Sequence, residues 1–222
     1  TLCVFVWLYD CRYPSKERGT QMNVEEIKRQ IINAGLSAYS CGLVSAAGGN
    51  ISMRYENRFF ITATNAPLRN LRPEDILEVD SSGNVIGEDY GGQRPSKEVG
   101  LHLAVFKNRD DIDSIIHVHP VFSIACSIAF PHDFPILTVS AINKIGRVGY
   151  IPFAQAGSKD LITGAEEAIH SNGPDMKTII MERHGIIVFD KGMEKCYERT
   201  ELVEETAKIA IYSAVAAAAE RS

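Results

Sequence analysis

The sequence has few cysteines, no long hydrophobic run and no concentration of basic residues. The cysteines are odd in number and scattered without a C-x-x-C pair, which is typical of a reduced, cytoplasmic protein. They lie at Cys3, Cys11, Cys41, Cys126 and Cys196. The chain carries a net charge of −5 without a lysine or arginine stripe, which indicates binding neither to nucleic acid nor to an anionic membrane. We therefore expect a small-molecule partner.

An apolar octapeptide, TLCVFVWL at residues 1–8, is too short to span a bilayer. A polar segment with proline and glycine follows it, and Met22 opens a good helical pattern. One interpretation is that residues 1–21 are a non-native extension; the alternative is an additional edge strand or a docked segment. Nothing in residues 22–222 resembles a linker, and the chain is 45% hydrophobic, so a single globular domain is expected there.

Helical spacing of apolar residues recurs along the chain. The first helix is predicted after Asn23, which suits a helix cap and is followed by acidic residues. A second helix is expected to open at Pro95. Further helices are predicted over 121–130, over 158–172 and from 193 to near the end of the chain, where alanine-rich sequence and charge pairs favour one long helix.

Alternating, aromatic-rich runs predict strands between these helices. One hairpin is expected around Glu56 and Asn57, and a second hairpin or meander around residues 81–84. A strand is predicted over 111–120 and a strand pair hinged at 183–185. This order of elements favours an α/β or α+β layered domain, with a central mixed, largely antiparallel sheet flanked by helices.

The heptapeptide SIIHVHP at residues 114–120 carries two histidines inside an apolar run. Side chains in a strand alternate between its faces, so His117 and His119 are expected to share one face. Two imidazoles on one face are a plausible half of a metal site. The alternative is a pair of core or edge histidines with no ligand role.

Two further residues are candidates to complete such a site. His184 lies much later in the chain at a predicted strand turn, and Glu98 lies at a predicted helix start, where the helix dipole favours an ionised carboxylate. Three imidazoles and a carboxylate suit zinc or another borderline divalent cation. His184 as a simple turn residue and Glu98 as a first-turn acid remain the alternatives.

Small polar residues at three places favour a phosphate site. They supply free N–H groups, hydroxyls and one cation, the groups that hold a phosphate. They are Gly48-Gly49-Asn50 before a predicted strand, Thr64-Asn65 at a strand end, and Ser96-Lys97 at a helix start. A plain turn is the alternative interpretation of the glycine pair.

Taken together, four segments resemble the class II aldolase/adducin superfamily. They are GGNIS at 48–52, PSKEVGLH at 95–102, HVHP at 117–120, and ERHG at 182–185 followed by a long helix. Their order and spacing are highly specific, and the likeness covers about residues 24–215. The resemblance implies a class II aldolase-like three-layer domain.

The resemblance also implies roles for individual residues. It makes His117, His119 and His184 the ligands of one Zn²⁺ per subunit, with Mn²⁺ or Co²⁺ as other ions that such ligands accept. It makes Glu98 both a resting metal ligand and the catalytic acid/base. The implied phosphate-binding residues are Gly49, Asn50, Thr64, Asn65, Ser96 and Lys97. Family members are typically cyclic homotetramers with active sites at subunit interfaces.

The implied activity is cleavage of a ketose 1-phosphate, such as L-fuculose 1-phosphate, to dihydroxyacetone phosphate and an aldehyde through a metal-stabilised enediolate. Lys97 stands where these aldolases usually have serine, which keeps open a 3-oxo-tetronate 4-phosphate decarboxylase-like lyase. A pentulose-phosphate 4-epimerase is less favoured because it typically has Asp in place of Glu98. The retained histidines argue against a non-enzymatic, adducin-like scaffold.

Two residues near these motifs are harder to place. The tyrosine that donates a proton in the aldolases has no obvious match, although Tyr212 on the last predicted helix is a candidate. His102, four residues after Glu98, shares its helix face. We expect His102 to be a packed residue that supports the site rather than a metal ligand.

Overall fold

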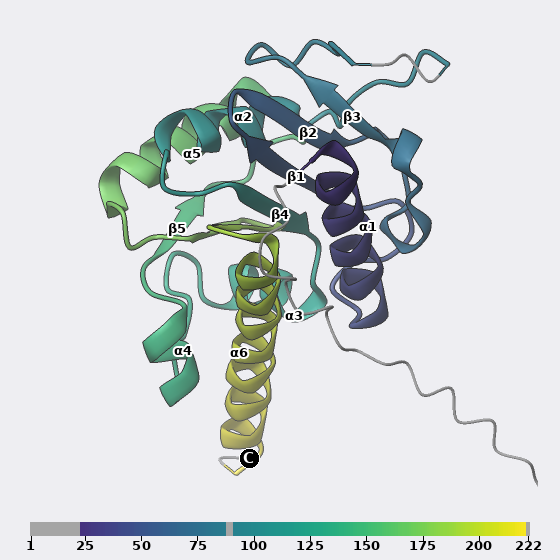
Figure 1. The fold of residues 1–222 in the computed structure, drawn as a ribbon. Helices are drawn as coiled ribbons and strands as arrows, with labels where there is room; N and C mark the ends of the chain where they lie inside the picture. Colours follow the sequence, from purple (N-terminus) through teal and green to yellow (C-terminus); the bar gives the residue numbers. More distant parts are fainter. Residues whose placement is uncertain (1–22, 88–90, 221–222) are drawn as a thin grey trace, which may run out of the picture.

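The computed structural model describes residues 23–87 and 91–220 (Figure 1). The extension expected at residues 1–21 lies outside the described residues. Among those described, no helix is both long enough and apolar enough to cross a membrane.

A seven-stranded sheet forms the centre of the described fold, with strand order β3-β2-β1-β4-β7-β6-β5. Neighbouring strands are antiparallel except β5 and β6, which are parallel. The strands are β1 (Asn50–Tyr55), β2 (Arg58–Thr62), β3 (Ile76–Val79), β4 (Ser114–Val118), β5 (Val148–Ile151), β6 (Thr178–Met181) and β7 (Gly185–Asp190). The predicted mixed, largely antiparallel sheet is thus confirmed.

Helices cover both faces of this sheet and make three layers (Figure 1). On one face pack α1 (Val24–Ser40), α3 (Val121–Ala129), α4 (Val139–Lys144) and α6 (Met193–Ala219); on the other pack α2 (Val99–Asn108) and α5 (Lys159–Asn172). Two short 3-10 turns, Leu68–Asn70 and Pro73–Asp75, connect β2 to β3. The flanking helices are confirmed as well.

Strand β4 shows why two helical layers are needed. Ile116 and Val118 join the core under α1, α3 and α6, whereas Ile115 joins the core under α2 and α5. All three side chains are fully buried. Burying an isoleucine or valine stabilises the fold by about 2 kcal/mol, so a strand that is apolar on both faces requires cover on both.

Several predicted boundaries agree with the structure. The Asn23 side chain caps α1 by accepting a 2.9 Å hydrogen bond from the Glu26 amide. The hairpin at Glu56 and Asn57 forms between β1 and β2. The strand pair hinged at 183–185 is β6 and β7, and the long last helix is α6.

Other boundaries differ for local physical reasons. Strand β4 ends at Val118, so His119 lies just beyond the strand, and α2 starts at Val99, after Pro95 and Glu98. In place of the predicted second hairpin, the structure has strand β3 and an isolated bridge between Val79 and Val85. The sequence also hid α4, which is too short to show a period, and β5, whose glycine and flanking breakers disguise a strand.

Candidate metal and substrate site

The site forms where the ends of three adjacent strands meet the start of a helix. His117 on β4 pairs with Asn50 on β1 and with Ile187 on β7. His184 belongs to the tight turn that joins β6 to β7, so the pairing of β4 with β7 carries it to His117. Glu98 is the residue that immediately precedes α2.

The structure brings the three predicted histidines together. One ring nitrogen from each lies within 4.8 Å of the others. The ring centroid of His117 is 4.7 Å from that of His119 and 5.0 Å from that of His184. The Nε2 atoms of His117 and His119 are 2.9 Å apart. The expectation that His119 belongs to the strand was wrong, yet its ring still points to this cluster.

Hydrogen bonding sets which nitrogen of His117 is available. Nδ1 of His117 lies 2.9 Å from the carbonyl oxygen of Ile186, and a carbonyl only accepts, so Nδ1 must carry the proton. Nε2 then presents its lone pair to the other imidazoles. A backbone carbonyl that fixes the tautomer in this way is a usual support for a metal-binding histidine.

Glu98 is buried against these rings, and its two oxygens have different surroundings. Its Oε2 lies 3.1 Å from Nε2 of His117 and accepts a 2.9 Å hydrogen bond from Nδ2 of Asn50. Burial alone would raise the pKa of Glu98, but the contacts with His117 and Asn50 and the nearby His184 hold that pKa well below its usual range. The group is therefore an ionised carboxylate at neutral pH.

The second oxygen of Glu98 is unusual. Oε1 is buried, lies 3.4 Å from Nε2 of His184, and has no hydrogen-bond partner among the described residues. An unpartnered buried carboxylate oxygen is costly, and this one lies beside the His184 ring. A divalent cation would satisfy Oε1 and the three imidazoles together, so this donor set fits a metal ion.

Burial favours the neutral, metal-binding form of His119 and His184. It lowers the pKa of His119 to about 4, with a further contribution from neighbouring His117 and His184. Burial and His117 also lower the pKa of His184. Protons therefore compete weakly for these nitrogens near neutral pH.

The glycine pair before β1 has a packing role that the sequence did not reveal. A Cβ on Gly48 would lie 2.8 Å from Nδ1 of His119, and a Cβ on Gly49 would lie 2.7 Å from the carbonyl oxygen of His117. Gly49 also has a φ of +76°, which disfavours other residues. The turn thus approaches both histidines closely, which only glycine permits.

Four of the six predicted phosphate-binding residues lie in two adjoining segments near Glu98, whereas Gly49 and Asn50 lie at the start of β1. The Thr64 amide donates to Arg94, and the Ser96 amide donates to Thr62, which holds the 62–65 and 94–97 segments side by side. Ser96 is buried, and its Oγ accepts from the Glu98 amide at 3.2 Å. Asn65 and Lys97 are exposed at the rim.

Tyr212, the candidate proton donor, does not join this cluster within one chain. It lies on the outer part of α6, is 62% exposed and contacts the ring of Phe122, with centroids 5.2 Å apart. His132 and His170 are exposed.

His102 is fully buried, as expected for a packed residue, but it also hydrogen-bonds to Asn50 and to Ser52. Ser52 was not anticipated, although its spacing from Asn50 places both on one face of β1.

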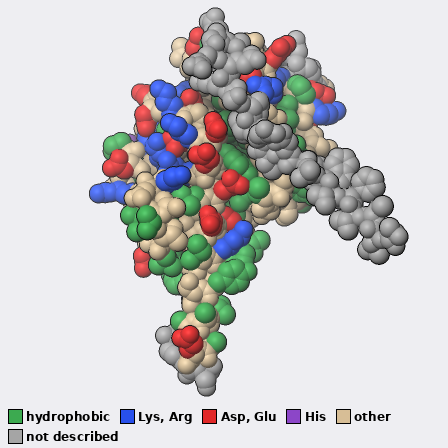
Figure 2. All heavy atoms as spheres, turned by 60° about the horizontal axis from the view of Figure 1, so that its bottom comes forward, with side chains coloured by type: hydrophobic (Ala, Val, Ile, Leu, Met, Phe, Trp, Pro, Cys, Tyr) green, Lys and Arg blue, Asp and Glu red, His purple; other side chains and the backbone are tan. Residues whose placement is uncertain are grey.

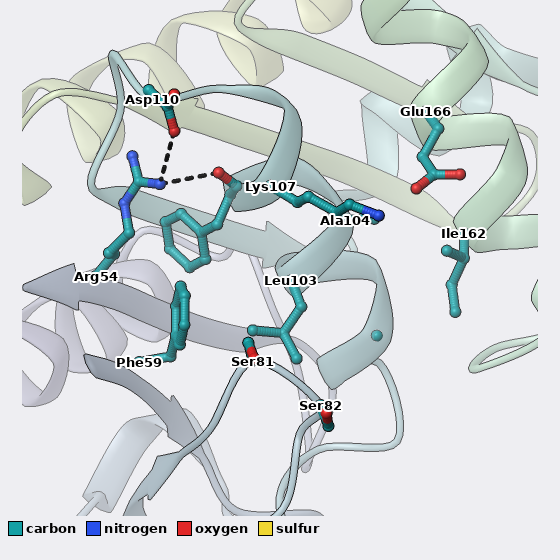
Figure 3. A pocket seen from close by; sticks show the side chains of 12 residues that line it. Arg54, Phe59, Ser81, Ser82, Leu103, Ala104, Lys107, Asp110, Ile162 and Glu166 are labelled. Atoms are coloured by element: carbon teal, nitrogen blue, oxygen red, sulfur yellow. Dashed lines mark hydrogen bonds and ion pairs between the residues drawn. The ribbon is translucent and has the colours of Figure 1, made fainter. Parts of the chain in front are cut away.

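A pocket of about 430 Å³ lies apart from this site, on the face covered by α2 and α5 (Figure 3). Its walls include Phe59, Leu103 and Ile162. Arg54 at its edge is already engaged by the backbone carbonyls of Phe106, Arg109 and Ile112. None of the predicted site residues lines this pocket.

Comparisons with known proteins agree with the geometry. The sequence profile of the Class II Aldolase and Adducin N-terminal domain matches residues 29–211. The L-fuculose phosphate aldolase of Methanocaldococcus jannaschii is 32% identical over 184 residues, which cover 83% of this chain and 95% of that protein. The 3-oxo-tetronate 4-phosphate decarboxylase of Haemophilus influenzae is 29% identical, over 82% of this chain and 85% of that protein.

Solved structures show the same fold. The L-fuculose-1-phosphate aldolase from Thermus thermophilus superimposes with a TM-score of 0.75 at 22% identity, covering 87% of this chain and 96% of that one. The chain therefore belongs to the class II aldolase and adducin family and, like the relatives named above, is a lyase.

Proposed function

We propose that the protein is a zinc-dependent sugar-phosphate aldolase that cleaves a ketose 1-phosphate, similar to L-fuculose 1-phosphate, to dihydroxyacetone phosphate and an aldehyde. The observation that carries this proposal is the convergence of His117, His119 and His184 beside the buried carboxylate of Glu98, whose Oε1 has no partner among the described residues. The relative named L-fuculose phosphate aldolase, at 32% identity, supports the choice of substrate class.

In this proposal the three imidazoles and Glu98 hold the cation. When bound, a zinc ion supplies a Lewis acid that polarises a carbonyl and stabilises the negative charge developed by carbon–carbon cleavage. Glu98 is ionised and buried beside the imidazoles, so it can accept a proton from the substrate and return it. Asn50 orients that carboxylate through its 2.9 Å hydrogen bond.

The loops at 62–65 and 94–97 bind the substrate phosphate in this proposal. Gly49 offers a backbone group, Thr64 and Ser96 offer hydroxyl groups, and Asn50, Asn65 and Lys97 add polar contacts and one positive charge. Holding the phosphate away from the bond that breaks keeps the reacting carbons in register with Glu98.

A second candidate is decarboxylation of a phosphorylated 3-oxo sugar acid. Lys97 favours it, because an exposed ammonium group beside the phosphate loops can pair with an additional carboxylate. The relative named 3-oxo-tetronate 4-phosphate decarboxylase supports this candidate. Both reactions would use the same cation site and the same ionised Glu98.

A substrate panel separates the two. Purified protein is incubated with ketose 1-phosphates and with phosphorylated 3-oxo acids, and dihydroxyacetone phosphate and carbon dioxide are assayed separately. We expect triose phosphate from the ketose 1-phosphates. Carbon dioxide without triose phosphate would replace the aldolase assignment by the decarboxylase, and inversion of a pentulose 5-phosphate without cleavage would favour an epimerase.

We propose zinc as the resident ion at one equivalent per chain, with Mn²⁺ or Co²⁺ able to replace it. Elemental analysis of protein purified without chelator tests this. A chain that holds no divalent metal under those conditions would support an adducin-like scaffold instead.

We also propose a cytoplasmic homotetramer with its active sites at subunit interfaces. Large apolar side chains are exposed on α3, α4 and the outer part of α6, which projects from the sheet (Figures 1 and 2). They are Val121, Ile128, Val139, Ile142, Tyr212 and Val215. An apolar surface of this kind is typical of an interface. Light scattering should give four times the chain mass, and Val215→Asp should give a smaller species.

A further inference from the structure

We infer that His102 is a positioning residue that acts on Glu98 through Asn50, and that Ser52 orients the His102 ring. This inference rests on the proposed lyase activity and goes beyond it, because His102 touches neither the imidazole cluster nor the rim of the phosphate loops. The evidence is a continuous line of buried polar contacts that runs from Ser52 through His102 and Asn50 to Glu98.

The four residues come from two elements that face each other. Asn50 and Ser52 are two residues apart on β1 and share one face, whereas Glu98 and His102 are four residues apart at the start of α2 and share one helix face. Each of these four residues is at most 6% exposed. Their hydrogen bonds therefore cannot be replaced by bulk water.

The direction of each hydrogen bond follows from chemistry. Nε2 of His102 is 2.5 Å from Oδ1 of Asn50, and an amide oxygen only accepts, so Nε2 must carry the proton. Nδ1 of neutral His102 is then an acceptor, and the Ser52 hydroxyl 2.6 Å away must donate to it. The Asn50 amide group is left pointing at Oε2 of Glu98.

These hydrogen bonds prevent the side-chain amide of Asn50 from flipping. A flipped amide would place its NH₂ group against the N–H of His102 and its oxygen against the carboxylate of Glu98, two repulsive contacts in a buried site. His102 thereby keeps a donor on Oε2 of Glu98, which leaves Oε1 as the oxygen that faces the imidazoles without a partner. Removing His102 should free both Asn50 and Glu98 to reorient.

Kinetics of four variants test the inference. His102→Leu removes the donor and is expected to lower kcat by about 10- to 100-fold, with KM within about twofold and zinc content unchanged. His102→Gln keeps an N–H at a similar position and should recover most of the loss. Ser52→Ala should give a smaller loss than His102→Leu.

Thr200→Val is the matched control. Thr200 is fully buried and its hydroxyl donates only within α6, to the Cys196 carbonyl at 2.8 Å, so this variant tests general loss of a buried hydrogen bond. We expect it to lower stability and leave kcat unchanged. Normal kcat in His102→Leu, or no recovery in His102→Gln, would overturn the inference.

A second measurement does not depend on activity. In zinc-free protein labelled with ¹⁵N, the ring nitrogens of His102 should report the Nε2–H tautomer, and the side-chain amide signals of Asn50 should shift in His102→Leu. An Nδ1–H tautomer, or unshifted Asn50 amide signals, would sink the inference even where the variants fold poorly. Wild-type protein that cleaves no substrate of the panel would instead overturn the proposed function and leave the tautomer result standing.

Discussion

At the scale of single residues, the site depends on side chains with two polar atoms, of which one is held by a structural contact and the other faces the site. Glu98 has one oxygen held by the Asn50 amide group and one without a partner among the described residues. His117 has one nitrogen held by the Ile186 carbonyl and one facing the cluster. In both residues a structural contact fixes the side chain and leaves the reactive atom available, which is how a site is preorganised.

Replacement of Glu98 tests its role as acid/base. Glu98→Gln keeps the size and an oxygen that can face the metal but cannot take up a proton at neutral pH. We expect zinc content to stay high and kcat to fall by at least about 100-fold. Glu78→Gln is the control, since this β3 carboxylate pairs with Arg58 away from the histidines. Near-normal turnover in Glu98→Gln would remove Glu98 from proton transfer.

Gly49 should be intolerant of a side chain. Gly49→Ala places a Cβ 2.7 Å from the His117 carbonyl oxygen at a φ of +76°, so it adds a steric clash to backbone strain. We expect the free energy of unfolding in urea to fall by about 2–3 kcal/mol. Gly42→Ala has a similar φ of +71° without a described atom within 4 Å, and should lose only about 1 kcal/mol. Equal losses would show that the close approach is unimportant.

At the scale of elements, hydrogen bonds from Glu204 on α6 hold the start of α3, the helix that follows His119. We call these contacts the Glu204 clamp. The buried carboxylate of Glu204 accepts hydrogen bonds from the Phe122 amide, the Ser123 amide and the Ser123 hydroxyl, at 2.8 to 3.1 Å. These groups form the first turn of α3, which follows His119 and Pro120 directly. The favourable helix dipole adds to this contact between two helices.

Loss of this clamp should loosen α3. Glu204→Gln replaces one acceptor oxygen by an NH₂ group that faces backbone N–H donors, so we expect the free energy of unfolding to fall by about 2–3 kcal/mol. Ser123→Ala removes only the hydroxyl donor and should cost about 1 kcal/mol. Urea denaturation measures both. A Glu204→Gln variant as stable as the wild type would mean that α3 is held mainly by apolar packing.

At the scale of the whole molecule, buried neutral histidines make stability depend on pH. Burial, aided by His117, lowers the pKa of His102 to about 3 and that of His119 to about 4, from about 6.5 in an unfolded chain. Between these values the unfolded chain binds more protons than the folded one. The free energy of unfolding therefore falls as the pH is lowered from about 6.5 towards about 4.

Urea denaturation of zinc-free protein between pH 7.5 and pH 4.5 checks this prediction. Each histidine that stays neutral contributes a slope of at most about 1.4 kcal/mol per pH unit in that window. His102→Gln removes one such group, so its slope should be smaller than that of the wild type. A flat profile between pH 6.5 and pH 5 would show that the imidazoles become protonated without penalty.

Much of the fold and of the site was predictable because its signals are local. Asn23 caps α1 through a contact three residues away, and the alternation around Glu56 and Asn57 specifies a hairpin. His117 and Glu98 could be identified as candidate ligands from residue type and position alone. The layered α/β class follows from the order of the helical and strand-like segments, and that order can be read from hydrophobic periodicity in one sequence.

What the sequence alone determined is therefore the kinds of donor atoms and the elements that carry them. Only the tertiary structure decided their meeting, because the register of β4 with β7 and β1 sets His184 and Asn50 beside His117 and no local period encodes that pairing. The same holds for His102, whose hydrogen bond to Asn50 joins residues 52 positions apart. Contacts between distant segments depend on which strands and helices pack together, and that choice is made by burial of the whole core.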